Sequence, residues 1–366
     1  MRKISLLTAS LITAAALAAC SNSGSDNNAT TEPVTTVETP APSTAESTAD
    51  ETEAETSAPD DTAEVHELKT GQALFAAHGT KSFATATVIM DGETIVLAYI
   101  DEYQFMDAET TDGVPNSENF TDYVSEGYVL GSKRVNSDSY STNMAAAGST
   151  VAIYDNFDYI QEFVAGKTVS ELEALTKEDK EAVVDAVSGA TLVDTSGYLQ
   201  AVLAAAEDAA EHTAVSYEGD LSELEINQTE GAAHGTKCFT LTTTVTGSDQ
   251  VVSAFIDEFQ YLSAETSTGV PNSENFTDYV AGDYVLASKR VNAEAYSTSM
   301  AAAGSTVAIN VNYDMIQEYV SGKTISELKE LEGMDGEEVI DAVSGATLAD
   351  TPNYIAEIVR TVESGK

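Results

Sequence analysis

The chain has 366 residues, and its 61 acidic side chains against 16 Lys and Arg give a formal net charge of −45. Such a surface repels nucleic acid and anionic lipid headgroups, so we expect neither as a binding partner. Cys20 and Cys238 are the only cysteines, which excludes a disulfide framework, an iron–sulfur cluster and a c-type haem site.

Residues 1–19 have the order of a secretory signal: a basic start, an apolar run and small residues before Cys20. The run is shorter than the roughly 20 apolar residues that span a bilayer. Leu17-Ala18-Ala19-Cys20 resembles the lipobox of bacterial lipoproteins, in which the cysteine is acylated and becomes the first mature residue. The resemblance implies a protein held by its lipid alone on the extracellular face of the cytoplasmic membrane, of the Gram-positive type. An ordinary cleaved signal with a chance cysteine is the alternative.

The segment that follows, residues 20–65, is dominated by Ser, Thr, Ala, Asp, Glu and Pro and contains no aromatic residue, Lys or Arg. That composition cannot bury a core. We therefore expect a disordered acidic linker that lets a folded head reach away from the membrane.

Beyond the linker the sequence repeats itself. His78-Gly79-Thr80-Lys81 recurs at 234–237, and the block 113–124 recurs at 269–280, each 156 residues later. This period is far longer than that of solenoid repeats. A copy of about 150 residues is long enough for its own core. We therefore predict two domains, at 66–215 and 216–366.

One copy predicts an α+β domain. Residues 83–90 alternate between polar and apolar, Asp91-Gly92 is a turn signal, and 95–105 form the returning strand. An irregular stretch is expected from 107 to about 150. Four helices with capping signals follow. We expect the first to be capped by Asn156 and ended by Gly166, and the second to start after the capping box Thr168–Glu171. The third should cover about 178–187, and the fourth should begin near Thr195, whose counterpart Thr351 precedes Pro352. A hairpin followed by helices indicates an antiparallel sheet covered by helices.

One short motif lies between the last two predicted helices of each copy, and its seven residues are identical in the two copies. It reads Asp185-Ala186-Val187-Ser188-Gly189-Ala190-Thr191 in the first copy and Asp341-Ala342-Val343-Ser344-Gly345-Ala346-Thr347 in the second. Threonine offers a hydroxyl nucleophile, and the small residues before it leave the backbone open to another protein.

This motif resembles the flavinylation motif of the FMN-binding domain family, in which a dedicated transferase links the phosphate of FMN to the final threonine. The resemblance implies two covalent FMN groups, on Thr191 and Thr347. The residues recognised by the FMN transferase would then be Asp185, Ser188, Gly189, Ala190, Asp341, Ser344, Gly345 and Ala346.

The lipobox, linker and paired motifs together resemble the pheromone lipoprotein A type of Gram-positive flavoprotein. This resemblance covers nearly the whole chain and implies a non-enzymatic electron carrier of extracellular electron transfer. Electrons would come from a membrane quinone-reducing dehydrogenase system and its quinone pool. They would leave to an extracellular acceptor such as ferric iron or free flavin.

Other blocks shared by the two copies are candidates for the flavin pocket. They are Lys133, Arg134 and Tyr140, with their counterparts Lys289, Arg290 and Tyr296. Cations near a flavin stabilise negative charge, and a tyrosine can stack on its ring. Salt bridges to the many carboxylates and ordinary core packing are the alternatives. His78 and His234 are expected to be surface or capping residues, since no metal-binding set is apparent, and Cys238 a small packing residue.

Two other functions stay open. A solute-binding or adhesive lipoprotein would use the same anchor and linker and hold its ligand noncovalently. A flavin-dependent reductase would need a further catalytic domain for FAD, and no residues remain to build one.

Overall fold

The computed structural model describes residues 64–343 and 345–365, which belong to one compact unit. The predicted signal, lipidated Cys20 and linker lie outside the described residues. None of the described helices is long and apolar enough to cross a membrane.

Two antiparallel sheets and ten α-helices make up the described residues, so the α+β class is confirmed. The strands are β1 Val65–Phe75, β2 Ser82–Asp91, β3 Thr94–Asp107, β4 Tyr128–Ser132, β5 Val215–Glu218, β6 Glu225–Gly231, β7 Cys238–Gly247, β8 Gln250–Ser263 and β9 Tyr284–Ser288. The helices are α1 Ser137–Ala146, α2 Ile153–Val164, α3 Val169–Leu175, α4 Lys180–Ala186, α5 Thr195–Glu211, α6 Ala293–Ala302, α7 Ile309–Val320, α8 Ile325–Glu332, α9 Gly336–Ala342 and α10 Thr351–Ser364. Short 3-10 turns lie at Ser117–Asn119, Leu221–Glu223 and Ser273–Asn275.

The first sheet has the strand order β4-β3-β2-β1-β5 and the second β6-β7-β8-β9. The predicted hairpin is present as β2 and β3, which pair from Ser82↔Gln104 to Asp91↔Thr94. Strand β5 pairs with β1, so residues on both sides of the expected boundary between 215 and 216 belong to one strand of the first sheet.

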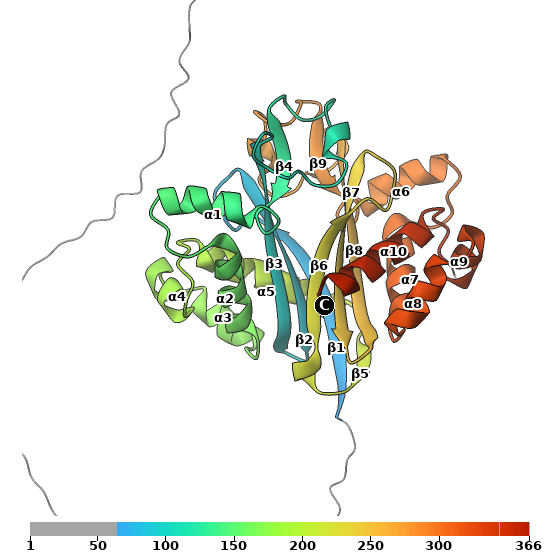
Figure 1. The fold of residues 1–366 in the computed structure, drawn as a ribbon, viewed down its shortest axis with the longest axis horizontal. Coiled ribbons are helices and arrows are strands. Elements are labelled where there is room, and N and C mark those ends of the chain that lie inside the picture. Colours follow the sequence, from blue (N-terminus) through green and yellow to red (C-terminus); the bar gives the residue numbers. More distant parts are fainter. Residues whose placement is uncertain (1–63, 344, 366) are drawn as a thin grey trace, which may run out of the picture. The chain divides into compact units, whose positions relative to one another are not determined.

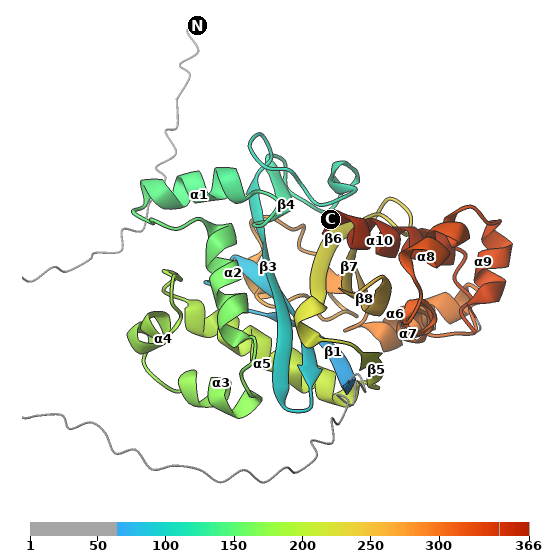
Figure 2. The same cartoon turned by 60° about the horizontal axis from the view of Figure 1, so that its bottom comes forward.

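Helices cover the outer face of each sheet, as Figures 1 and 2 show. Helix α5 packs on β1 and β2, and α2 packs on β3. In the second half of the chain, α10 packs on β6 and β7 and α7 on β8. One apolar core lies under each helical layer; Phe157 belongs to the first core and Tyr313, its counterpart 156 residues later, to the second.

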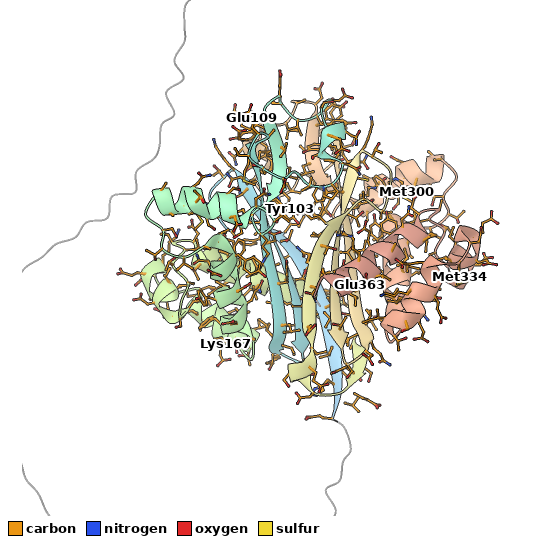
Figure 3. The ribbon with its side chains drawn as sticks, in the orientation of Figure 1. Tyr103, Glu109, Lys167, Met300, Met334 and Glu363 are labelled. Carbon is orange, nitrogen blue, oxygen red and sulfur yellow. The ribbon has the colours of Figure 1, made fainter. Side chains whose placement is uncertain are left out.

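A third core lies between the two sheets and is rich in aromatic side chains. Phe83 stacks on Tyr103 with ring centroids 5.4 Å apart, and Phe239 stacks on Phe259 at 5.0 Å. Phe83 also contacts Phe259 at 6.0 Å across the two sheets. Figure 3 shows Tyr103 in this central region. Nine of the ten residues of β2 are consequently buried, because this strand is covered on both faces.

Each half of the chain also reaches across to the other. The Asn116 side chain donates to the carbonyl of Cys238 at 2.8 Å, and Asn272 donates to that of Ser82 at 2.7 Å. Both asparagines have a φ of 66°, which a short polar side chain tolerates better than most. These contacts are reciprocal, since every donor and acceptor in one has its counterpart 156 residues away in the other.

Two local predictions were wrong. Residues 107–150 are not irregular throughout: they contain β4 and α1, and β4 pairs with the end of β3. Asn156 does not cap α2, which begins three residues earlier at Ile153 after the N-cap Ala152. Asn156 is instead a fully buried residue of the first turns, and its amide donates back to the Ala152 carbonyl at 2.9 Å.

The remaining helix predictions are confirmed. Thr168 and Thr324 each form the predicted capping box with the glutamate three residues later. Helix α4 lies within the predicted range of 178–187, and α5 and α10 begin at Thr195 and Thr351.

Candidate functional site

The two seven-residue motifs end one helix and form the loop before the next. The first runs from the end of α4 to the loop before α5, and the second occupies the same place between α9 and α10. Thr191 and Thr347 are both exposed. Val187 and Ala190 are buried, as are Val343 and Ala346. Two buried residues, three positions apart, therefore anchor each loop in its core while the threonine stays accessible.

The predicted recognition residues are also accessible where the structure describes them. Asp185, Ser188 and Gly189 are exposed in the first loop, and Asp341 and Gly345 in the second. Ser344 lies outside the described residues. Ala190 and Ala346 are the exceptions, at 7% and 5% exposure, and act as loop anchors.

A glycine with positive φ turns each loop. Gly189 has a φ of 94° and Gly345 one of 93°, values that side-chain-bearing residues rarely adopt. A Cβ on Gly189 would come within 2.9 Å of the Tyr159 ring, and one on Gly345 within 2.8 Å of the Met315 methyl group. Both the backbone angle and the close neighbour therefore require glycine at this position.

A buried asparagine that the motif does not contain holds each threonine. The Asn156 Oδ1 atom accepts the backbone N–H of Thr191 at 2.7 Å, and Asn312 does the same for Thr347 at 2.7 Å. Both asparagines are fully buried and donate to carbonyls at the start of α2 or α7. From the sequence, Asn156 was predicted to cap a helix. The one sign of another role was that asparagine occupies the equivalent position, 312, in the second copy.

The threonine hydroxyl is held much less tightly than the amide. Its distance to the same asparagine oxygen is 3.4 Å for Thr191 and 3.5 Å for Thr347, at the long limit of a hydrogen bond. A covalent modification of the hydroxyl would therefore sacrifice little, while the short amide bond kept the loop in place.

Each loop leads into a helix whose N-terminus carries an Asp–His pair. The His78 Nδ1 atom lies 2.9 Å from Asp194, and His234 Nδ1 lies 2.7 Å from Asp350. Burial opposes ionisation of Asp194, but hydrogen bonds from Lys180 and His78 outweigh it and lower its pKa. The prediction that both histidines are surface or capping residues agrees with these partly exposed pairs.

The lysines predicted for the flavin pocket form buried ion pairs with glutamates. Lys133 is 1% exposed and pairs with the buried Glu102 at 2.5 Å; Lys289 pairs in the same way with Glu258. Tyr198 donates a further hydrogen bond to Glu102 at 2.7 Å. Salt bridges, the alternative considered above, are what the structure shows for both lysines.

Arg134 and Arg290 lie on the same segments and are similarly occupied. Arg134 donates to the Ile100 carbonyl at 2.5 Å and pairs with Asp158 at 2.9 Å, and Arg290 pairs with Asp314 at 2.9 Å.

Tyr140 and Tyr296 are partly buried against the two helical cores. The ammonium groups of Lys133 and Lys289 lie over their rings, each 4.6 Å from the centroid. Core packing, the alternative considered above, accounts for these two tyrosines.

A surface groove of about 600 Å³ lies between α6 and the start of α7, and no residue of the second motif lines it. Ser297, Thr298, Ser305 and Thr306 supply polar groups along it, and Ala301 and Ala308 supply small apolar ones. Asn312, which holds Thr347, donates to the carbonyl of Ala308 at 3.0 Å. The groove and the threonine therefore share one structural support.

No family model, curated protein or solved structure matches the chain in the three comparisons with known proteins. Within the described ranges, no group of three or more His, Cys, Asp or Glu side chains could hold a metal ion.

Proposed function

We propose that the chain carries two FMN groups in phosphoester linkage, on Thr191 and Thr347, and serves as an electron carrier on the extracellular face of the cytoplasmic membrane. The observation that supports this most strongly is the pair of equivalent loops. In each, an exposed threonine hydroxyl with a weak hydrogen bond follows a glycine turn, and a buried asparagine fixes the threonine backbone.

The linkage would be made by a separate FMN transferase using a flavin dinucleotide as donor. The threonine Oγ forms a bond to the FMN phosphorus while the bond from that phosphorus to the bridging oxygen breaks. The nucleoside monophosphate leaves, and a base of the transferase takes the hydroxyl proton, with a metal ion assisting. The chain itself contributes the exposed hydroxyl and the accessible Asp185, Ser188 and Gly189 as a recognition surface.

When bound, the flavin would supply reversible electron transfer. The groove between α6 and α7 could take part of a flavin, and its link to Thr347 is Asn312, which donates to the carbonyl of the lining residue Ala308. Its hydroxyl groups suit the polar ribityl chain and edge of a flavin, and its alanines suit the ring face.

The wider role rests on the resemblance to electron-transfer lipoproteins. We propose that residues 66–215 and 216–366 are tandem copies of one flavin-carrying domain, tethered through Cys20. Electrons would enter from a membrane quinone-reducing dehydrogenase system and leave to ferric iron or free flavin. The two loops lie in the helical layers on opposite outer faces of the paired sheets, so acceptors can approach each without crossing the other (Figure 1).

Intact mass spectrometry of the chain, made with and without an FMN transferase, tests the proposal. We expect two flavin phosphoryl adducts, one in either Thr191→Ala or Thr347→Ala, and none in the double variant. Thr142→Ala, which removes an exposed threonine of α1, is the matched control and should keep both adducts. A colourless wild-type product of unchanged mass would reject the proposal and favour the solute-binding alternative.

The holding role of Asn156 provides a second test within one molecule. In Asn156→Asp the side chain still accepts from Thr191 but can no longer donate to the Ala152 carbonyl. We expect slower modification of Thr191 than of Thr347, measured by peptide mapping over time, because only the first loop loses its support. Equal rates at the two sites would mean that the transferase shapes the loop by itself.

A further inference from the structure

The two threonine loops have different neighbours, although their motifs are identical. In the first half, the ring of Tyr159, a residue of α2, lies against Gly189. A Cβ built on that glycine would be 2.9 Å from each of the ring atoms Cδ1, Cδ2 and Cε2. Equal distances to these three atoms place the glycine over the centre of the ring, so it faces the flat side of the phenol. In the second half the equivalent residue is Met315, whose thioether faces Gly345.

The two neighbours also differ in how far the core uses them. Met315 is partly buried and packs against the second helical core. Among the described residues, those packed in the first helical core do not include Tyr159, which is 37% exposed. Core packing therefore accounts for the methionine but leaves much of the tyrosine ring uncovered.

Val193 adds a second exposed apolar side chain to the first loop. It is 58% exposed and follows Thr191 by two residues, whereas Gly189 precedes Thr191 by two. Its equivalent in the second half is the smaller Ala349. Single apolar side chains on a surface are ordinary, but two beside one candidate attachment site indicate a group that covers them.

A flavin on Thr191 would reach this apolar surface. Two residues span at most about 7 Å, so Gly189 and the ring against it lie close to the threonine. The phosphate and ribityl chain of FMN are long enough to bridge that distance. In the second half, the groove between α6 and α7 that could take part of a flavin has only non-aromatic lining residues in the described part of the chain.

We propose that Tyr159 is the stacking residue for the flavin on Thr191, with Val193 as a second contact, and that the flavin on Thr347 meets Met315 in place of an aromatic ring. This inference rests on the proposed function, because it takes both attachments as given. Gly189 covers one face of the phenol, and the exposed part of the ring is left for the flavin. Aromatic rings of this kind stack in an offset arrangement. The two flavins of one chain are then chemically distinct, although identical motifs carry them.

Flavin fluorescence reports this contact without any measurement of electron-carrier activity. The phenol of Tyr159 passes one electron to a photoexcited flavin in contact with it and takes the same electron back in the dark. The cycle leaves no net oxidation or reduction, but the emission is lost. A stacked flavin therefore has a short fluorescence lifetime, and an unstacked flavin has a long one.

Chains with a single flavin separate the two sites. Thr347→Ala keeps only the flavin on Thr191, and Thr191→Ala keeps only the one on Thr347. After intact mass has verified one adduct in each, we expect the flavin on Thr191 to have the larger short-lifetime fraction. Adding Tyr159→Met should lower the ratio of stacked to unstacked flavin about tenfold, as expected for loss of an aromatic stack.

The reciprocal exchange and a distant tyrosine complete the set of variants. Met315→Tyr should raise the short-lifetime fraction of the flavin on Thr347. Each exchange introduces the residue that the other half packs against the same glycine, and thermal unfolding verifies the fold. Tyr128→Phe, at an exposed tyrosine of β4, keeps a ring against Tyr279 and is the matched control. It should leave the lifetimes of the flavin on Thr191 unchanged.

The mass and the lifetimes test different statements. A full adduct with equal lifetimes at the two sites would overturn the inference and leave the proposed function standing. Lifetimes that do not respond to Tyr159→Met would do the same. A chain without any adduct would overturn the proposed function, and this inference with it.

Discussion

The threonine loops and the sheet interface differ in how far the two halves of the chain have diverged. At the loops, the motif, the positive-φ glycine and the buried asparagine are the same in both halves. At the interface the halves differ: the residues equivalent to Glu230 and Tyr103, 156 positions away in sequence, are Leu74 and Phe259. The difference teaches that the loops are the same in both halves, as the proposed function requires, whereas Glu230 and Tyr103 make one side of the interface more polar than the other.

The largest effect is expected where the halves agree. Lys133→Met would leave Glu102 buried without its cation, which costs about 3–5 kcal/mol. Lys289→Met should cost a similar amount, because Glu258 has the same partner. Urea unfolding measures both. The double variant Lys133→Met with Glu102→Leu should recover most of the loss, and a mild single variant would mean that the pair contributes little to the fold.

The second effect should differ in sign between the halves. Glu230→Leu should stabilise the protein at pH 9, and Leu74→Glu should destabilise it, each on the order of 3 kcal/mol. The ordinary glutamate pKa of 4.5 is raised to about 8 in the folded chain by burial. The unfolded chain therefore loses this proton first, and wild-type stability declines as the pH rises from 4.5 to 8.

Unfolding curves for wild type and Glu230→Leu across that pH range measure the decline. The two proteins should differ little at pH 4 and most at pH 9. A constant difference at every pH would show that Glu230 keeps the same protonation state when folded and unfolded.

A smaller effect sharpens the comparison of the loops. Gly189→Ala and Gly345→Ala both force alanine into positive φ, at a cost of about 1–2 kcal/mol. Gly189→Ala should cost more, because its Cβ meets the ring of Tyr159, whereas Gly345 faces the flexible end of Met315. Thermal unfolding compares them, and a larger cost at Gly345 would contradict this reading.

The smallest effect comes from an ion pair that only the first half has. Lys180 pairs with Asp194 at 2.9 Å, and its counterpart is Gly336. Lys180→Ala should cost below about 1 kcal/mol, because the lysine is largely exposed. The lowered pKa of Asp194 adds stability above its ordinary pKa of 3.8, which is lost as the pH falls through the folded value. In Lys180→Ala the free energy of unfolding should therefore fall less steeply as the pH is lowered through the acidic range, because Asp194 has lost one of the partners that lower its pKa.

Local signals predicted much of the fold. The alternating residues and the turn at Asp91-Gly92 predicted the β2–β3 hairpin, and the threonine capping boxes predicted the starts of α3 and α8, because neighbouring residues determine these features. Residues 107–150 were wrongly predicted to be irregular, because their structure depends on distant residues. Strand β4 is stabilised by pairing with β3, and the 3-10 turn after Asn116 is stabilised by contact with the other half.

The candidate site was predictable only in part. The motif located the loops, but the asparagine that holds each threonine lies 35 residues before it in sequence. Lys133 was misleading for the same reason: its partner Glu102 is 31 residues away on the neighbouring strand. The interface could not be predicted, because alternation in β2 indicates one buried face and a second sheet covers the other.

The hydroxyls of Thr87 and Thr243 lie 3.5 Å apart, and these two residues are counterparts of one another. A residue meets its own counterpart only on an axis of two-fold rotation, so the interface has the isologous form of a symmetric homodimer. Two separate chains, each with one half, would present the same complementary surfaces. Joining them in a single polypeptide fixes the stoichiometry and lets the two partners mutate independently, which a homodimer encoded by one gene cannot do.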